Sequence, residues 1–536
     1  MPPANGASAE QLRWNFVFMA CMVAACDAVL TMPAGYATSM LAEGVGQVGN
    51  GAMFANVVVS SLVLAPYVVS SLGCKRSMIS CMVVSTTAVA LFAFAAQQEQ
   101  GSAEQWAIYL IAAIVDGQVQ GVLWTAQGSF FAATSECMAR GGAGGALTRS
   151  RTTSASPEHA RGDATPGRTR HSSVDDDSSP DHSPGLAGLP ARSRIHSRRS
   201  TLGSMCSTTS SQFTRTISAG LREVLPAVAD TTMVLDVVDD EAFQEATALL
   251  AGRFAAIYLM VDVLVKLIAS ALQGDVLLWT QLWPAVLPFH AMFYGFAGIS
   301  LATAAATTLL IDPVVASSVA EEPQHGKCQA AVRLWPLPQL WCLAFTNLAF
   351  GFSAGYMNGV VNARFTAHNQ FFGQGSIGTL MAATSCMAAV CSLVFSHVVR
   401  HTGNMFVMVV GTFAFAGLSL CILVHCPHEA NHFWGPWLVL LYALQGAGRS
   451  VYEGTNRMLF ARTFKGEDSG GAFANCTMQA GSAIFAAFLL QSSQPSTLTG
   501  AWVILCLAFL IVPGYLCAER IRDRDLRGTN LEPLAN

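Results

Sequence analysis

Long runs of apolar residues, separated by short polar connections, dominate the pattern along this chain of 536 residues. A helix needs roughly 20 predominantly apolar residues to cross the hydrocarbon core of a bilayer. Residues 53–72 and 78–96 form such runs early in the chain, and 407–424 and 501–516 form comparable runs near its end. The pattern predicts twelve membrane-spanning helices, at about 15–40, 52–72, 76–96, 106–135, 244–272, 284–311, 336–362, 371–398, 404–425, 434–462, 469–491 and 498–518.

The predicted helices form two sets of six, with one long hydrophilic interruption after the fourth helix. The expected fold is therefore all-α and integral to the membrane, with two six-helix halves. We predict these segments: helices one to four of the N-terminal half at 12–136, a disordered cytoplasmic insert at 137–243, helices five and six at 244–312, a central cytoplasmic linker at 313–334, the C-terminal half at 335–519 and a cytoplasmic tail at 520–536.

The composition excludes a soluble protein. Charged residues make up only 12% of the chain, whereas about 25% is usual in soluble domains. The fifteen cysteines are scattered, mostly singly within apolar segments, so we expect packing roles for them and no disulfide framework. We expect a lipid bilayer as surroundings, no nucleic-acid partner, no bound metal and no cofactor.

Basic residues are distributed unevenly between alternate loops. One set of loops carries Lys75, Arg76, the Arg-rich interruption and Arg400, whereas the opposite set carries acidic residues such as Glu99 and Asp275. Cytoplasmic loops of membrane proteins have an excess of Lys and Arg. We therefore expect both termini in the cytoplasm, which agrees with an even number of helices. The plasma membrane and an endomembrane are equally open.

The interruption at about 140–238 is rich in Ser, Thr, Arg, Gly, Pro and Asp. Such a composition cannot bury enough apolar surface to offset the loss of chain entropy, so we expect most of it to be disordered. Arginines precede Ser173 and Ser200 in patterns that basophilic kinases use, which makes both serines candidate phosphorylation sites. Two interpretations stay open: a solvated linker, or a regulatory loop whose phosphorylation alters contacts with acidic lipid or a partner.

Polar side chains recur at helical spacing on the first, fourth, seventh and tenth predicted helices. Polar groups in hydrocarbon are costly, so they usually face a bundle interior or a water-filled cavity. In transporters built from repeated three-helix units, these helix positions line the substrate path. The candidates for a cavity that binds a substrate or ion are Asp27, Asp116, Gln120, Gln127, Asn358, Asn362, Gln445, Arg449, Glu453 and Asn456. For single Asn and Gln residues the alternative is interhelical hydrogen bonding, worth about 0.6 kcal/mol each.

Two predicted helices carry opposite charges four residues apart, which places them on one face. Glu453 can pair with Arg449 or Arg457 in the tenth helix, and Asp262 can neutralise Lys266 in the fifth. Pairing is important because an isolated charge at the centre of a membrane helix costs roughly 2.5–3.5 kcal/mol.

Gly351, Gly355 and Gly359 fall on one face of the seventh predicted helix. Small residues at this spacing let two helix backbones approach closely. We interpret them as helix-packing positions, with a hinge for alternating access as the alternative.

One motif typical of an enzyme is present. The segment His428-Glu-Ala-Asn-His432 matches the His-Glu-x-x-His pattern of zinc proteases, which needs both histidines on one helical face. Here it lies in a short connection opened by Pro427, without an evident third ligand, so we interpret the match as chance. The sequence also has no Walker-type phosphate loop. We therefore expect neither an enzyme nor an ATP-driven pump.

Three segments carry a family resemblance. Gly121-Val-Leu-Trp-Thr-Ala-Gln-Gly128 resembles the Gly-x-x-Leu-Trp-x-Ala-Gln-Gly segment of the Unc-ninety-three-like branch of the major facilitator superfamily. Residues 61–78 are similar to that branch's second helix and following loop. Gly448-Arg-Ser-Val-Tyr452 lies where relatives carry Gly-Asp-x-Val-Trp, so this chain departs from them at Arg449 and Tyr452.

The resemblance implies a twelve-helix major facilitator fold and, for most of the wider superfamily, secondary transport. Our first hypothesis is a secondary transporter, or transporter-like protein, that moves a small solute or ion through a central cavity by alternating access. In it, Asp27 or Asp116 binds a proton or cation, and Arg449 receives an anionic group or neutralises an acid. Some relatives instead regulate potassium channels or act as trafficking adaptors. The second hypothesis is therefore a non-transporting subunit that binds a membrane channel or receptor.

Overall fold

The computed structural model describes residues 9–42, 44–153, 240–273, 287–312, 329–425, 434–466, 468–493 and 496–529. The chain divides into two compact units, 1–146 with 238–536 and 147–237. Residues 154–239, which make up most of the predicted insert, lie outside the described residues, as do Ser173 and Ser200. The described part is all-helical, as predicted.

The N-terminal half consists of α1 (Ala9–Met40), α2 (Val45–Val59), the π-helical segment η1 (Ser60–Leu64), α3 (Ala65–Ala95), α4 (Ala103–Thr153), α6 (Asp240–Leu272) and α7 (Phe289–Leu310). After the short helix α9 (Ala330–Arg333), the C-terminal half consists of α10 (Pro338–Tyr356), π-helical η3 (Met357–Thr366), η4 (Gln374–Ser376), α11 (Ile377–Thr402), α12 (Asn404–His425), η5 (Gly435–Trp437), α13 (Leu438–Ser450), π-helical η6 (Val451–Asn456), α14 (Arg457–Thr463), α15 (Asp468–Ser492) and α16 (Thr497–Thr529).

These elements form the twelve predicted crossings. Ten stretches of the described chain are long and apolar enough to span a membrane. One of them, Val45–Ala95, contains two helices that separate at Gly73, where φ is 76° and the backbone is not helical. The remaining crossing is the tenth along the chain, α13 with η6 and α14, which is less apolar because it carries Arg449, Glu453 and Arg457.

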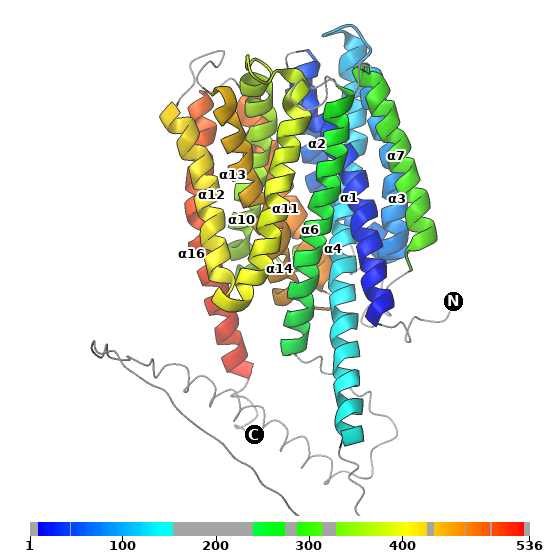
Figure 1. Ribbon diagram of the computed structural model, residues 1–536, viewed down its shortest axis with the longest axis vertical. Helices are drawn as coiled ribbons and strands as arrows, with labels where there is room; N and C mark the ends of the chain where they lie inside the picture. Colours follow the sequence, from blue (N-terminus) through cyan, green and yellow to red (C-terminus); the bar gives the residue numbers. More distant parts are fainter. Residues whose placement is uncertain are drawn as a thin grey trace, which may run out of the picture. The chain divides into compact units, whose positions relative to one another are not determined.

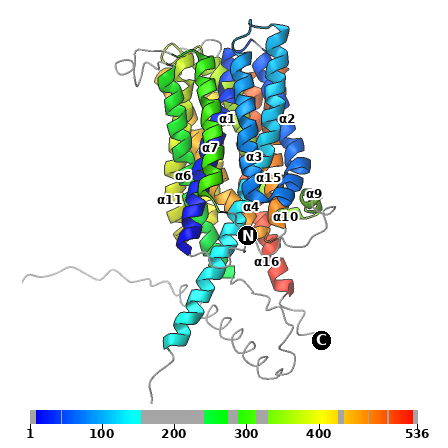
Figure 2. The same cartoon turned by 90° about the vertical axis from the view of Figure 1, so that its right-hand side faces the viewer.

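The helices of this unit run roughly parallel and antiparallel to one another (Figure 1). In both views α1 begins and α16 ends at the same end of the bundle, which requires an even number of crossings (Figures 1 and 2). We call this end the terminal side, and the other end the opposite side.

The two halves repeat one turn. Gly73 follows the second crossing and Gly403 follows the eighth, and both have a φ of 76°. Side chains rarely adopt a positive φ, whereas glycine does so at no steric cost. The equivalent turns of the two halves thus depend on the same residue type.

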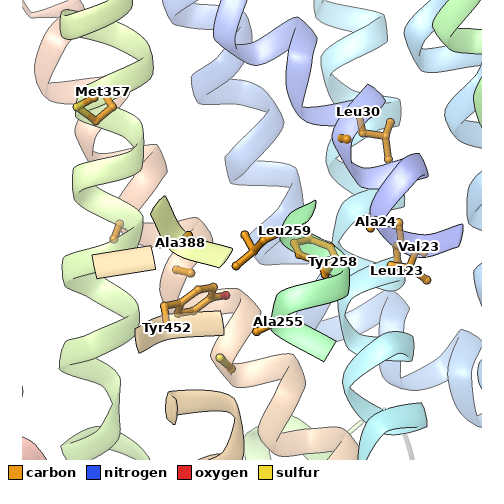
Figure 3. Packing of buried hydrophobic residues seen from close by; sticks show 14 of the residues in the cluster. Val23, Ala24, Leu30, Leu123, Ala255, Tyr258, Leu259, Met357, Ala388 and Tyr452 are labelled. Atoms are coloured by element: carbon orange, nitrogen blue, oxygen red, sulfur yellow. The ribbon is translucent and has the colours of Figure 1, made fainter. Parts of the chain in front are cut away.

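The halves pack against each other along two helix pairs, α6 with α11 and α2 with α15. Phe54 of α2 stacks on Phe488 of α15 with ring centroids 6.1 Å apart. Figure 3 shows Tyr258 and Leu259 of α6 between Val23 of α1 and Tyr452 of the C-terminal half. A continuous apolar core therefore crosses the boundary between the halves.

The outer surface is apolar as well. Leu309, Phe413, Val424 and Trp437 are each more than two-thirds exposed. Soluble monomers rarely expose large contiguous apolar patches, whereas lipid tails accommodate such side chains. The exposed side chains fit the membrane location that the sequence predicts.

The glycine ridge of the seventh crossing faces α15. A Cβ atom at Gly351 would collide with the carbonyl oxygen of Ala480, and one at Gly359 would collide with the side chain of Gln491. At Gly355 a Cβ would lie 2.8 Å from that of Ala487. The contacts fit the packing interpretation of this ridge.

Candidate functional site

A network of buried charges joins the two halves near the middle of the bundle. Asp262 of α6 accepts hydrogen bonds from Lys266 Nζ at 2.7 Å and from Arg449 Nη1 at 2.8 Å. Ser385 of α11 donates to the same carboxylate at 2.6 Å and accepts from both cations at 3.0–3.1 Å. Asp262 and Lys266 belong to the N-terminal half, and Arg449 and Ser385 to the C-terminal half. The carboxylate therefore bridges the halves.

The network continues along the tenth crossing. Glu453 lies between two arginines, with Arg457 Nη2 at 2.8 Å from one oxygen and Arg449 Nε at 3.9 Å from the other. The Arg457 guanidinium lies over the rings of Phe254 and Tyr452, 5.6 Å and 5.7 Å from their centroids. Aromatic faces attract cations, so these rings compensate part of the hydration that Arg457 loses.

Asp27 of α1 joins the network through tyrosine. One of its oxygens accepts a hydrogen bond from Trp124 Nε1 at 2.6 Å, and the other accepts from the Tyr258 hydroxyl. The Tyr258 ring lies under Arg449, with the guanidinium carbon 5.9 Å from the ring centroid. Asp27 thus has two neutral donors and a cation on the far side of one of them.

The charges of this network balance when every group is ionised. It contains three cations and three carboxylates: Lys266, Arg449 and Arg457 with Asp27, Asp262 and Glu453. Removing one partner of a buried ion pair leaves an uncompensated charge and typically costs about 3–5 kcal/mol. The network therefore has no net charge as long as the two halves stay together.

Asp116 lies apart from this network. Its carboxylate accepts from Gln120 Nε2 at 2.9 Å, and the same amide nitrogen lies 3.6 Å from Met53 Sδ. Both Asp116 and Gln120 are buried, and no basic residue among the described parts of the chain pairs with Asp116. Both Gln120 and Met53 belong to the N-terminal half.

Asn456 takes part in a chain of amides within the C-terminal half. Its Nδ2 donates to Asn347 Oδ1 at 2.6 Å, and Asn347 Nδ2 donates to Gln479 Oε1 at 2.7 Å. These bonds connect η6, α10 and α15. The geometry fits the alternative interpretation of interhelical hydrogen bonding.

Asn358 and Asn362 lie in η3, toward the opposite side, where they contact α1. Thr38 Oγ1 donates to the Asn358 carbonyl at 2.8 Å, and Asn362 Nδ2 donates to the Gly35 carbonyl at 3.3 Å. The Tyr442 hydroxyl donates to Asn362 Oδ1 at 2.5 Å. The bonds from Thr38 and Asn362 connect the two halves.

Gln127 and Gln445 each carry a buried side-chain oxygen without a hydrogen-bond partner. Gln127 lines a small cavity between the halves, with a volume of about 10 Å³, which is room for roughly one water molecule. Because an unpaired buried acceptor costs free energy, these two oxygens are available to a bound molecule or to water.

The structure therefore divides the predicted site residues into groups. It brings Asp27, Arg449 and Glu453 into one network, with Gln127 beside Glu453, and it separates them from Asp116, from Asn358 with Asn362, and from Asn456. Eight of the ten predicted residues are buried, and Asn358 and Arg449 are half-buried, so the stripes pack against protein in this conformation. The His428–His432 match lies outside the described residues.

Sequence reasoning missed two members of the network, Tyr258 and Ser385. A single aromatic residue and a single serine on apolar helices give no periodic signal. The Asp262–Arg449 contact did leave a signal in the sequence. The tenth crossing carries two arginines and one glutamate, so an acid from another helix is needed to balance its charge. Asp262 already had Lys266 as a partner, which concealed it.

No protein-family model matches the chain, and no curated protein matches its sequence. Among solved structures, it is similar to a bacterial homologue of the iron transporter ferroportin, with a TM-score of 0.54 and 10% identity over 96% of this chain and 99% of that one. It is also similar to the major facilitator superfamily transporter FucP, with a TM-score of 0.53 and 10% identity over 94% and 97% of the two chains. For the Escherichia coli xylose transporter XylE, the TM-score is 0.52 and the identity 8%, over 94% and 96%.

These similarities define the fold of the chain. It has the twelve-helix fold of the major facilitator superfamily. The three compared proteins are transporters. Its assignment to the Unc-ninety-three-like branch stays a prediction.

Proposed function

We propose that this protein is a secondary transporter that moves a small solute or ion by alternating access of its two halves. The observation that carries the proposal is the contact of Asp262 with both Lys266 of its own half and Arg449 of the other. Movement of the halves requires the second contact to open. Asp262 and Arg449 each have a second neighbour of opposite charge. Asp262 keeps Lys266, and Arg449 can move to Glu453, which now lies 3.9 Å from it. After separation Asp262 and Arg449 each still have a neighbour of opposite charge, although each half then carries one excess charge.

Contacts at both ends of the bundle hold this conformation closed. On the opposite side, α1 binds η3 through Thr38 and Asn362. On the terminal side, the Phe131 ring of α4 packs edge-on against Phe473 of α15, with centroids 6.4 Å apart. We interpret the conformation as occluded, between the two open states that alternating access requires.

Separation of the halves also changes their charge balance. The N-terminal part of the network holds Asp27, Asp262 and Lys266, and it carries one excess negative charge. The C-terminal part holds Arg449, Glu453 and Arg457, and it carries one excess positive charge. We propose that a proton or cation on Asp27 offsets the first excess, and that an anionic group near Arg449 offsets the second. Asp116 is the alternative cation site.

We further propose that the terminal side is cytoplasmic. Lys75 and Arg76 follow the break at Gly73 after the second crossing, and Arg462 and Lys465 follow the tenth crossing, so an even number of crossings places all four on the side of the termini. An excess of Lys and Arg is typical of cytoplasmic loops. Accessibility of cysteines introduced in these loops to an impermeant thiol reagent in intact cells tests the assignment.

Flux in reconstituted vesicles tests the transport proposal. Purified full-length protein is placed in vesicles that contain a pH-sensitive dye, and a library of radiolabelled solutes is screened for uptake and accompanying proton movement. We expect Asp27→Asn and Arg449→Ala to lower uptake at least about tenfold, since each removes a charge that the cycle needs. Matched controls are Asp312→Asn and Arg333→Ala, which change exposed residues outside the network.

Unchanged flux in Arg449→Ala would remove this residue from the mechanism, and unchanged flux in Asp116→Asn would leave Asp27 as the cation site. If no solute or ion moves, and affinity capture from native membranes instead yields a stable channel or receptor that is lost on deletion of 140–238, the regulatory hypothesis replaces transport.

A further inference from the structure

Two cysteines from helices far apart in the chain contact each other. Cys342 lies near the start of α10 and Cys517 lies in α16, and their thiols form a side-chain hydrogen bond. Both are free thiols in this structure, with Cys342 half-buried and Cys517 exposed. Neither belongs to the charge network, so a role of this pair is separate from the proposed transport.

The backbones of the two helices approach closely beside this pair. A Cβ atom at Gly514 of α16 would lie 2.4 Å from the Cys342 carbonyl oxygen. Cys517 follows Gly514 by three residues, which places it on the same face of α16, about 4.5 Å further along the helix axis. The absence of a side chain at Gly514 thus permits the close approach that brings the two thiols together.

The directions of the helices point the two thiols toward each other. The seventh crossing, α10, begins on the terminal side, and the twelfth crossing, α16, ends there, so the two helices are antiparallel. Side chains lean toward the N-terminus of their own helix. Cys342 therefore leans toward the terminal side, whereas Cys517 leans back toward the level of Cys342. This is the arrangement that a disulfide between the two helices requires.

The pair lies at the boundary of the membrane. Trp341, which directly precedes Cys342, is exposed, as is Trp335, and tryptophan is enriched at membrane–water interfaces. Within one turn after Cys517 the chain carries Glu519 and Arg520, and α16 continues past the bundle on this side (Figures 1 and 2). A water-soluble oxidant can therefore reach the exposed Cys517 thiol without crossing the hydrocarbon.

We propose that Cys342 and Cys517 form a redox-sensitive dithiol, which a peroxide converts into a disulfide between α10 and α16. The Cys517 thiolate attacks the O–O bond of hydrogen peroxide and becomes a sulfenic acid, and the released hydroxide takes up the thiol proton to give water. The Cys342 thiol then displaces the hydroxyl group as a second water while the S–S bond forms. The two sulfur atoms lose two electrons in total, and the peroxide accepts both.

The disulfide fastens two helices of the same half and does not join the halves. If the terminal side is cytoplasmic, the pair is reduced in resting cells, because cytosolic thiols are kept reduced and disulfides there are usually transient. The link then forms under oxidising conditions, and thiol–disulfide exchange with a reductant reverses it. It stabilises the C-terminal half while the two halves stay free to move.

Peptide mass analysis of the purified full-length protein in detergent tests the proposal. The protein is treated with hydrogen peroxide, the remaining thiols are blocked with iodoacetamide, and chymotryptic peptides are compared with and without dithiothreitol. We expect a linked pair of peptides that contain Cys342 and Cys517 and that dithiothreitol separates. Oxidation should also raise the apparent melting temperature by at least about 3 °C, since a cross-link restricts the unfolded chain.

Single substitutions assign the link. Cys342→Ser and Cys517→Ser should each abolish both the linked peptides and the rise in melting temperature. Cys506→Ser, which removes another exposed cysteine of α16, is the matched control and should retain both. Phenylarsine oxide, which bridges two adjacent thiols, probes the reduced pair. It should protect Cys342 and Cys517 from a maleimide in the unsubstituted protein and should not protect the remaining cysteine in either single variant.

The proposal fails if peroxide oxidises Cys506 while Cys342 and Cys517 both stay free, or if Cys517 links to a different cysteine or to a second protein molecule. Equal protection by phenylarsine oxide in the unsubstituted protein and in the single variants would show that the two thiols are not adjacent. A link that forms without any rise in melting temperature would overturn its fastening role.

Discussion

Single residues in this protein act mainly through the charges they neutralise. Asp262 contacts two cations and a hydroxyl within 2.6–2.8 Å. Its burial would be unfavourable without them, because isolated charges lose their hydration. One carboxylate thus fixes the positions of two basic side chains from different halves.

The Asp262→Asn substitution should therefore destabilise the protein strongly. It leaves Lys266 and Arg449 without their common counter-charge, and we expect a loss of about 3–5 kcal/mol. The apparent melting temperature of the purified protein in detergent measures it. The double variant with Arg449→Gln should lose less than the sum of the two single variants, since contacting residues are not additive. Additive losses would mean that the contact does not contribute.

At the scale of elements, two of the predicted polar stripes continue into irregular helical segments. Residues 357–366 and 451–456 are π-helical, and such segments are frequent at functional sites. One extra residue in a turn rotates the following side chains by about 100°. In these segments Asn358 and Asn362 contact α1, and Asn456 contacts α10.

The glycine ridge of α10 provides a second prediction. Gly351→Leu should destabilise the protein by about 1–3 kcal/mol, because its side chain has to displace the α15 backbone at Ala480. Thermal unfolding in detergent checks this. Gly295→Leu on α7 is the matched control, since a Cβ atom there meets nothing within 4 Å. Equal melting temperatures for the two variants would contradict the packing role.

At the scale of the whole molecule, the protein consists of two six-helix halves with the same architecture. The helix pairs α6 with α11 and α2 with α15 hold the halves together, and the repeated glycine turns at Gly73 and Gly403 mark corresponding positions. Function in the proposed cycle depends on relative movement across these contacts.

A cross-link between the halves tests that movement. Ser270 Oγ of α6 and Thr379 Oγ1 of α11 lie 2.5 Å apart on the opposite side, so cysteines at these two positions should form a disulfide. We expect oxidation to stop uptake of the transported solute and a reductant to restore it. Ser85 and Ser300, whose hydroxyls contact each other, both lie within the N-terminal half, and oxidation of the pair Ser85→Cys with Ser300→Cys should leave uptake unchanged. Uptake that continues in the cross-linked Ser270–Thr379 protein would contradict alternating access.

The sequence alone determined the membrane location, the twelve crossings and the repeated halves, because a bilayer demands long apolar helices whatever lies around them. It also indicated that Asp27, Arg449 and Glu453 are candidate functional residues, since charged side chains within membrane helices are costly. Only the tertiary structure decided which charges meet. Asp262 and Arg449 are 187 residues apart along the chain, and no periodicity within one helix specifies the partner that another helix brings beside it.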